Sequence, residues 1–353
     1  MDDRTRVLVT AVGGGGHGEQ ILKALRLGVL DYFIVGADAN ELCHQFQMCD
    51  ENLILPLASD PKYLEALLAC IKQYRIQAIF HGCEPELKLF SANRTQIESA
   101  GVMLPINPQD VISLCMNKKK TMAWLIENGF HAPRFSELNQ VEQIKEIDYF
   151  PVIIKPSIGG GGSRDTFIAQ TPEELRLLAT YLVEYGESFL VQEYVGSYKE
   201  EYTVGVLHDL DGKFINAIAV KRYISGGLNI RSAVKNLTPR KELGDWLVIS
   251  SGISHGYVGP FPEVTKDCIE IAKQLGVRGA VNIQCRYVEG KVYPFEINPR
   301  FSGTTSIRAM MGYNEPDLLI RKHLKGETIP VNFDYQSGVV MRGLTEYRMT
   351  NDR

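Results

Sequence analysis

Short apolar runs alternate with amphipathic segments through the first third of the chain. We predict strands and helices in strict alternation: strands at Val7–Val12, Tyr32–Val35, Asn52–Leu55 and Ala78–Phe80, and helices at Glu19–Leu27, Pro61–Tyr74 and Glu86–Ala100. This rhythm is typical of a parallel, doubly wound α/β sheet. Ligands of such sheets bind beyond the carboxyl ends of the strands, so the loops at residues 13–18, 38–40 and 81–86 are candidate binding loops.

The rest of the chain predicts two α+β units. The first has helices at Pro108–Cys115, Lys118–Gly129 and Pro172–Tyr185 and strands at Val152–Lys155, Thr166–Ala169 and Phe189–Glu193. The second has strands at Glu201–Leu207 and Phe214–Val220, a helix at Pro262–Leu275 and a hairpin over residues 282–298. We therefore predict three domains, at residues 1–107, 108–194 and 195–345, because a chain this long exceeds one hydrophobic core.

The C-terminal hairpin is the most informative of these elements. Two β-rich runs flank residues 289–291, and a three-residue loop there would pair Val288 with Val292. That register places Gln284 opposite Glu296. A two-residue turn would shift the register by one and turn these side chains to opposite faces.

The same register groups several polar side chains on one face of the hairpin. Asn282 lies opposite Asn298, and the two-residue period of a strand projects Gln284, Glu296, Asn298 and Arg300 to the same side. Carboxylate and amide oxygens suit Mg²⁺, which usually keeps substrate phosphates among its ligands. The alternative is an ordinary hairpin with a hydrated polar face.

Composition and charge exclude several classes of function. The chain has 353 residues, 44% hydrophobic and 23% charged, with a net charge of −4. These values are those of a globular protein, and they give no indication of a nucleic-acid surface or a polybasic membrane anchor. Seven cysteines are scattered without metal-binding spacing, and no apolar run is long enough to span a bilayer. We therefore expect free thiols and a cytoplasmic protein that binds neither membranes nor nucleic acid.

Two glycine-rich loops are candidate phosphate sites. Residues 13–18 satisfy G-x-G-x-x-G between a strand and a helix, and Asp38 follows at the spacing of a dinucleotide-binding motif. Taken alone, this motif would indicate a nicotinamide-dependent oxidoreductase, but we favour plain turn geometry as the role of these glycines. The second loop, Gly159, Gly160, Gly161 and Gly162 with Ser163, follows Lys155 at a strand end. A cation beside a glycine flap suits nucleotide phosphates, and a flexible surface hairpin is the alternative.

Other polar residues extend this second candidate site. Lys118 begins a predicted helix, where a cation is unfavourable unless an anion binds nearby. Glu193 ends a strand and could accept ribose hydroxyls, while the backbone at Tyr194 and Val195 could contact an adenine edge. Glu201 could approach the predicted metal site. For each glutamate alone, a surface ion pair is the alternative.

Taken together, these residues resemble the ATP-grasp superfamily, and most closely a single unit of the carbamoyl-phosphate synthase large subunit. The resemblance extends over residues 1–345 and implies an N-terminal pre-ATP-grasp domain followed by a two-lobed ATP-grasp domain. It also implies that the ATP phosphates and base are contacted by Lys118, Lys155 and residues 159–163, and that the rest of the nucleotide is held by Glu193, Tyr194, Val195 and Glu201. The implied ligands of Mg²⁺ or Mn²⁺ are Gln284, Glu296 and Asn298. Arg300 would contact the transferring phosphoryl group.

The resemblance implies an ADP-forming ligase. A carboxylate and ATP would give an acyl-phosphate that an amine then attacks, with Arg300, Glu201 and Lys155 as catalytic residues. Lys118 and Lys155 stand where the synthase has arginines, and one unit without its partner half disfavours a complete synthase. An oxidoreductase and a non-catalytic nucleotide-binding module remain alternatives.

The substrate residues are less constrained. We expect them among residues that face the predicted ATP site, with a solvated surface as the alternative for the cations. The candidates are Glu84, Glu86, Lys221, Arg231, Arg300, Ser302 and Gly303. The expected partners are a small carboxylate and an amine, and the family resemblance also suggests a homodimer.

Overall fold

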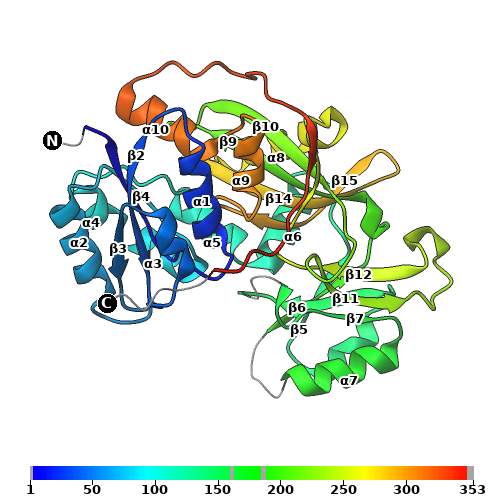
Figure 1. Cartoon of the computed structure of the whole chain (residues 1–353). Helices are drawn as coiled ribbons and strands as arrows, with labels where there is room; N and C mark the ends of the chain where they lie inside the picture. The colour runs from blue at the N-terminus through cyan, green and yellow to red at the C-terminus, as the bar shows by residue number, and fades with distance from the viewer. Residues whose placement is uncertain (1–2, 160–162, 184–187, 348–353) are drawn as a thin grey trace.

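A computed structural model of the chain describes residues 3–159, 163–183 and 188–347. Three regions are visible in Figure 1: the N-terminal sheet, the small sheet above α7 and the large C-terminal sheet. The N-terminal region contains β1 (Thr5–Val9), α1 (His17–Arg26), β2 (Tyr32–Asp38), a 3₁₀ helix (His44–Met48), β3 (Glu51–Ile54), α2 (Tyr63–Tyr74), β4 (Ala78–Phe80), α3 (Glu84–Ala92) and α4 (Arg94–Glu98).

The N-terminal sheet is parallel, as predicted. Its strand order is β3-β2-β1-β4, and every pair within it runs parallel. Alternate residues of β1 enter different cores: Val7 packs on the α1 side, whereas Leu8 packs against α2 and α3. The single helix predicted at Glu86–Ala100 is wrong, because Asn93 leaves helical geometry (φ −113°, ψ 21°) and separates α3 from α4.

The middle region is a small lobe with its own core. Its strands β5 (Phe135–Leu138), β6 (Val152–Pro156), β7 (Phe167–Ala169) and β8 (Phe189–Glu193) form an antiparallel sheet in the order β5-β8-β6-β7. Helix α7 (Pro172–Val183) and a 3₁₀ helix (Val141–Glu146) cover one face of this sheet. Figure 1 shows α7 below the sheet, on the side away from the rest of the molecule.

The C-terminal lobe is built on a six-stranded antiparallel sheet in the order β15-β14-β9-β10-β13-β16. Its elements are β9 (Glu201–His208), β10 (Phe214–Arg222), β13 (Gly256–Gly259), α8 (Pro262–Gln274), β14 (Ala280–Val288), β15 (Lys291–Asn298), α9 (Thr305–Met310), α10 (Glu315–Lys325) and β16 (Gly338–Val340), with 3₁₀ helices at Tyr198–Glu200 and Lys241–Leu243. A separate hairpin, β11 (Ile230–Lys235) and β12 (Trp246–Ser250), projects toward the small lobe and was not predicted.

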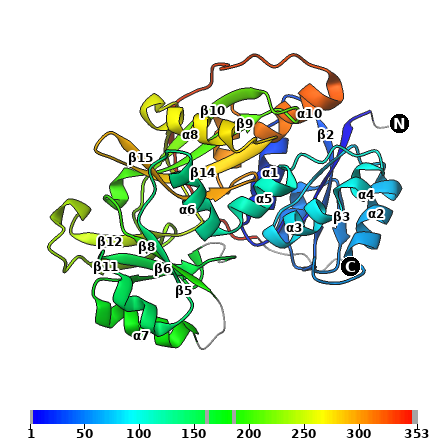
Figure 2. The ribbon, with the colours of Figure 1, turned by 180° about the vertical axis from the view of Figure 1, so that it is seen from behind.

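Helices α5 (Gln109–Cys115) and α6 (Lys118–Glu127) join the three regions. We predicted them in the small lobe, but Val111 and Met122 pack in one apolar cluster with the strands of the C-terminal lobe. Figure 2 shows both helices between the N-terminal sheet and the small lobe. The N-terminal sheet also shares a core cluster with α9 and α10, so the boundary near residue 107 is a packed junction rather than a linker.

The turn of the β14–β15 hairpin differs from the prediction. Val288 pairs with Lys291, so the turn has two residues, Glu289 and Gly290, instead of three. Both have positive φ, at 49° and 78°, as a type I′ turn requires. The three-residue loop that we predicted is therefore wrong.

A β-bulge in β15 restores the predicted register. The strand contains one additional residue, Phe295, between the pairs formed by its neighbours. Beyond this bulge, Gln284 lies opposite Glu296 and Asn282 lies opposite Asn298. Both predicted pairs are thus confirmed, and the bulge is what makes a two-residue turn compatible with them.

Within the described residues, no helix combines the length and the apolar character that crossing a membrane demands. All seven cysteines are free, as predicted. Five of them are buried, so they act mainly as small apolar core residues.

Candidate active site

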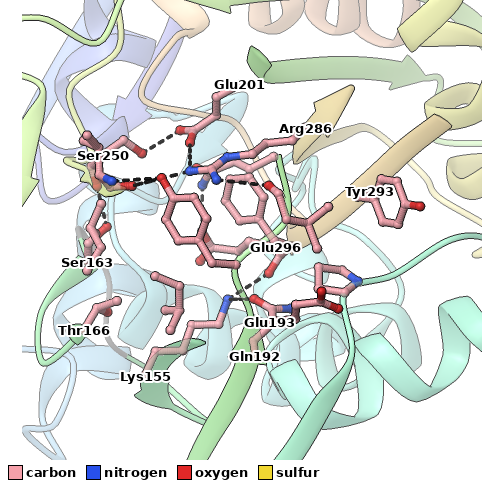
Figure 3. Close-up of a pocket in the computed structure, with 18 of the residues that line it drawn as sticks. Lys155, Ser163, Thr166, Gln192, Glu193, Glu201, Ser250, Arg286, Tyr293 and Glu296 are labelled. Atoms are coloured by element: carbon pink, nitrogen blue, oxygen red, sulfur yellow. Dashed lines mark hydrogen bonds and ion pairs between the residues drawn. The ribbon is translucent and has the colours of Figure 1, made fainter. Parts of the chain in front are cut away.

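A cleft of about 750 Å³ lies between the small lobe and the C-terminal lobe. Strands β6 and β8 form one wall, β14 and β15 the opposite wall, and β12 closes one end. Figure 3 shows Lys155 and Gln192 facing Glu296 across this cleft, with Glu201, Arg286 and Ser250 gathered at the other end. Of the residues predicted for the nucleotide and metal, the lining brings together Lys118, Lys155, Ser163, Glu193, Tyr194, Val195, Glu201, Gln284 and Glu296.

Lys155 lies at the base of the cleft with its charge poorly compensated. Its Nζ donates to Gln192 Oε1 at 2.8 Å and to the Phe295 carbonyl oxygen at 3.0 Å. The carbonyl it contacts belongs to the bulge residue of β15. Burial lowers the pKa of Lys155 to about 7, opposed by Glu296, and among the described residues no carboxylate forms an ion pair with it. An anionic ligand would supply that missing charge.

The glycine loop beside Lys155 is anchored at both described ends. Lys118 Nζ donates to the Gly159 carbonyl oxygen at 2.5 Å, and Ser163 Oγ donates to the Ser250 carbonyl oxygen at 2.8 Å. Gly159 has φ +78°, a conformation that favours glycine. The predicted residues Gly160, Gly161 and Gly162 lie outside the described part of the chain.

The predicted nucleoside residues line the opposite end of the cleft. Glu193 forms an ion pair with Arg240 at 2.9 Å, so the ion pair that we named as the alternative role of this glutamate is present. The Tyr194 amide donates to the Pro151 carbonyl oxygen, and the Val195 carbonyl accepts from Arg286 at 3.1 Å. These backbone groups are engaged within the protein, so Tyr194 and Val195 shape the wall of the cleft in this structure.

Glu201 holds two arginines instead of facing the metal site. Its Oε1 accepts from Arg222 at 2.7 Å and from Ser250 Oγ at 2.6 Å, and its Oε2 accepts from Arg286 at 3.2 Å. All of these groups are buried. The expectation that Glu201 assists directly at the metal is therefore corrected: it positions Arg286, which stands opposite it on β14.

Sequence reasoning missed Arg286. Arg286 follows Gln284 by two residues on β14, so the two-residue period already placed it on the polar face of the hairpin. The guanidinium of Arg286 stacks over the Tyr194 ring at 4.3 Å from its centroid. One carboxylate between two guanidiniums leaves this end of the cleft with a net positive charge.

The predicted metal ligands lie together on the hairpin. Gln284 Nε2 donates to Glu296 Oε2 at 2.7 Å, and Asn298 follows on the same side of β15. Among the described residues there is no group of three His, Cys, Asp or Glu side chains that could hold a metal. One carboxylate and two amide oxygens still fit Mg²⁺, because this ion commonly completes its shell with water and substrate phosphates.

Arg300 follows β15 and lies between this strand and the N-terminal domain. Its Nη2 donates to Asn298 Oδ1 at 3.1 Å and lies 3.5 Å from Glu84 Oε1, while its buried Nε has no partner among the described residues. A cavity of about 360 Å³ is lined by Arg300, Glu84, Lys118 and Glu296. Glu84 therefore lies beside Arg300 at this cavity, and its role at a substrate stays a prediction.

Three predicted substrate residues are not brought to the cleft. Glu86 is buried and accepts from Thr10 Oγ1 and Tyr63 Oη, both at 2.6 Å. Lys221 lies over the Tyr202 ring at 5.9 Å, on the opposite face of β10 from the inward-pointing Arg222. Arg231 is exposed on β11. The expectation for Glu86, Lys221 and Arg231 is corrected, because strand parity and interior hydrogen bonds direct these side chains elsewhere.

Ser302 and Gly303 follow Arg300 at the start of α9. Ser302 Oγ lies 2.8 Å from Thr304 Oγ1, and the Gly303 carbonyl oxygen accepts from Arg342 at 2.6 Å. Ser302 is buried and engaged in the turn before the helix. Both residues therefore lie near the site without opening onto the nucleotide cleft.

The N-terminal glycine loop is built as a packed turn. Asp38 Oδ2 accepts from the Gly13 amide at 2.8 Å, and its Oδ1 accepts from the Asn40 amide at 2.9 Å. A Cβ at Gly18 would lie 2.3 Å from the Ala11 carbonyl oxygen. Both motif features thus have a structural explanation, and the oxidoreductase alternative gains no support from the loop.

These observations define a class of protein. A small lobe and a large lobe enclose a cleft with lysines on one wall and a hairpin of carboxylate and amide oxygens on the other, as in the ATP-grasp fold. Three family models match consecutive parts of the chain: PylC-like, N-terminal domain at residues 8–105, carbamoyl-phosphate synthase L chain, ATP binding domain at 115–225, and ATP-grasp in the biosynthetic pathway with Ter operon at 254–346. Together these matches support an ATP-grasp protein.

Curated relatives include carbamoyl phosphate synthase large chains. That of Gemmatimonas aurantiaca is 25% identical over 325 residues, which is 87% of this chain and 26% of the relative. That of Thermoplasma volcanium is 26% identical over 258 residues, which is 70% of this chain and 23% of the relative. The chain therefore spans about a quarter of the length of these relatives.

Solved structures show the same fold. One is the biotin carboxylase domain of Hydrogenobacter thermophilus 2-oxoglutarate carboxylase, in complex with MgADP and bicarbonate. The two structures match with a TM-score of 0.63 and 20% sequence identity, over 93% of this chain and 71% of the carboxylase chain. The L-amino acid ligase from Bacillus licheniformis matches with a TM-score of 0.63 and 15% sequence identity, over 92% of this chain and 75% of the ligase chain.

Proposed function

We propose that the protein is an ATP- and Mg²⁺-dependent ligase that activates a carboxylate as an acyl-phosphate and joins it to an amine, releasing ADP and phosphate. The observation that carries this proposal is that Lys155, a buried cation with no ion-pair partner among the described residues, faces the Gln284–Glu296 pair across one cleft. Mn²⁺ is an alternative metal, and a cytoplasmic homodimer remains a prediction.

The described residues support such a reaction by position and charge. Lys155 and Lys118 would neutralise the phosphates, while Gln284, Glu296 and Asn298 would hold Mg²⁺, which supplies further charge neutralisation when bound. The γ-phosphoryl group of ATP would move to a carboxylate oxygen beside Arg300, and ADP would leave. The amine nitrogen would then attack the carbonyl carbon, the carbon–oxygen bond to phosphate would break, and the amine would lose a proton.

An ADP-release assay tests the proposal. Purified protein is incubated with MgATP and pairs drawn from a panel of carboxylates and amines, and products are identified by mass spectrometry. We expect ADP and an amide product for at least one pair. Binding of ATP without ADP release for every pair would favour the non-catalytic nucleotide-binding module instead.

Lys155→Met provides the matched variant for the nucleotide. It removes the buried cation and keeps a side chain of similar length, so we expect ATP affinity to fall by about 10-fold to 100-fold, as for loss of a charge-assisted contact. Calorimetric titration of MgATP measures this change. Unchanged affinity in a folded variant would contradict the assignment of Lys155 to the phosphates.

A further inference from the structure

A second large cavity lies where the C-terminal segment returns to the N-terminal domain. After β16 the chain runs back toward the N-terminal region, as the red segment in Figure 1 shows. The cavity between this segment, α1 and α9 measures about 1190 Å³ and shares no lining residue with the nucleotide cleft. Its apolar wall includes Leu228, Ile253, Ile307, Met310, Met341 and Leu344.

Among the residues that the structure describes, four charged ones line this cavity: Glu19, Lys23, Arg26 and Arg342. Glu19 forms an ion pair with Lys23, and Arg26 forms one with Asp50. Arg342 Nη2 donates to Gln20 Oε1 at 2.8 Å, to the Gly303 carbonyl oxygen at 2.6 Å and to Ser306 Oγ at 3.2 Å. All three acceptors are neutral, and within the described part of the chain no carboxylate forms an ion pair with Arg342. Burial is the main reason that its pKa falls to about 10. A guanidinium held in this way is suited to a planar anion such as a carboxylate.

The cavity adjoins the reaction centre through two short segments. Ser250 lines the nucleotide cleft, and Ile253, three residues further, lines the cavity. Gly303 follows Arg300 by three residues and packs so closely on this loop that a Cβ would lie 3.2 Å from the Gly252 carbonyl oxygen. A ligand in the cavity would therefore lie beside the loop and the turn that border the phosphoryl-transfer site.

We propose that this cavity binds the amine substrate of the ligase, a molecule with a carboxylate and an amine on an apolar body, which is the chemistry of an apolar amino acid. Arg342 holds the carboxylate of this substrate, and its amine attacks the acyl-phosphate. The proposal rests on the proposed ligase function and names one substrate class for it. Six apolar side chains match the body of such a substrate, and Arg342 matches its charge. Arg342 is thus a specificity-determining residue as well as a contact that fixes the C-terminal segment to α1 and α9.

The test compares L-leucine with L-leucinamide, which has the same apolar body but no carboxylate. ADP release is measured for each, alone and paired with each common amino acid, in the presence of MgATP. We expect leucine to support ADP release and leucinamide to be at least about 10-fold less effective, because a charged hydrogen-bond partner is lost. Equal ADP release with leucine and leucinamide would overturn the proposal.

Two variants separate recognition from structural support. Arg342→Gln keeps amide donors for the neutral acceptors but removes the charge, whereas Arg342→Lys keeps the charge. We expect Arg342→Gln to lower kcat/KM for leucine by about 30-fold with the KM for ATP unchanged, and Arg342→Lys to retain part of the activity. Arg176→Ala, on the exposed face of α7, is the control and should match the wild type.

The outcomes distinguish this proposal from the ligase function itself. If both Arg342 variants lower the melting temperature equally and leave the KM for leucine unchanged, Arg342 is only structural and the proposal is wrong. ADP release with polar acids such as aspartate, but not with leucine, would overturn the substrate class and leave the ligase function intact. Absence of ADP release with every acid would refute the ligase function and this proposal together.

Discussion

The chain contains two glycine-rich loops that end strands, and the structure uses them differently. At the N-terminal loop, both oxygens of Asp38 accept hydrogen bonds from backbone amides, so the acidic residue completes a turn. Beside the second loop, Lys155 faces a cleft and lacks an ion-pair partner among the described residues. The difference teaches that a motif residue indicates a ligand only when the fold leaves its charge uncompensated.

Two glutamates of α3 repeat this contrast within one turn of helix. Glu84 lines a cavity beside Arg300, at 3.5 Å from its guanidinium. Glu86 is buried, and its carboxylate accepts hydrogen bonds from Thr10, Tyr63 and the Gly82 amide. Residues two apart on a helix point in different directions, so sequence proximity alone could not tell which glutamate reaches the site.

The largest effect on activity is expected at Glu296 on β15. Glu296→Gln removes the carboxylate charge from the predicted magnesium ligands while preserving size, so we expect ADP formation to fall by about 10³-fold or more. Circular dichroism and thermal melting should remain close to the wild type, because Glu296 is only partly buried. Wild-type ADP release from this variant would contradict the metal assignment.

Arg300→Ala should have the next largest effect. The Arg300 guanidinium is expected to contact the transferring phosphoryl group, so its loss should lower kcat by about 10²-fold with little change in KM for ATP. Steady-state kinetics separates the two parameters. A change confined to KM would instead assign Arg300 to ground-state binding.

A buried histidine pair in the N-terminal domain should make stability depend on pH. His17 Nε2 lies 3.2 Å from His81 Nδ1, and burial, with a smaller contribution from Arg300, lowers the pKa of His81 to about 3. Between pH 6.5 and 3 the unfolded chain therefore binds a proton that the folded chain does not. The free energy of unfolding should fall with decreasing pH in this window, by roughly 1.4 kcal/mol per unit for His81.

Urea unfolding at pH 7 and pH 5 measures this dependence. His81→Asn should unfold with a smaller difference between the two pH values than the wild type, because it cannot take up the proton in either state. An identical difference in both proteins would show that other groups cause the acid sensitivity.

The smallest effect on activity is expected at Asp38. Asp38→Asn keeps a side-chain acceptor for the Gly13 amide, so ADP release should stay within about 3-fold of the wild type, and the unfolding free energy should fall by about 1 kcal/mol. Chemical denaturation and the same ADP assay measure both values. A loss of activity comparable to that of Glu296→Gln would remove the distinction between the two loops.

Sequence periodicity predicted much of the fold and the centre of the site. Alternation of strands and helices identified the parallel N-terminal sheet, and the pairing of Gln284 with Glu296 is confirmed. The bulge at Phe295 was not predictable, because its carbonyl is fixed by Lys155 from a distant strand. The same limit applies to Lys221, whose orientation depends on which face of β10 packs against α8.

Tertiary packing also explains why Arg286 was missed. Arg286 had a visible signal in the strand period, but its importance depends on Glu201 and Tyr194, which are 85 and 92 positions away in the chain. Arg222 and Ser250 join it only because three strands and the β11–β12 hairpin meet at one end of the cleft. No local pattern encodes such a meeting point.

The additional residue at Phe295 makes the hairpin sensitive to its own length. Inserting one position between the turn and Phe295, with the bulge kept, would place Glu296 opposite Ile283 instead of Gln284, and the carboxylate would then emerge on the far surface of the sheet. Insertions and deletions are usually tolerated near loop tips, yet here a change beside a solvent-exposed tip would act as an active-site mutation. Homologous proteins that keep the activity should therefore conserve the spacing of this segment even where its residues vary.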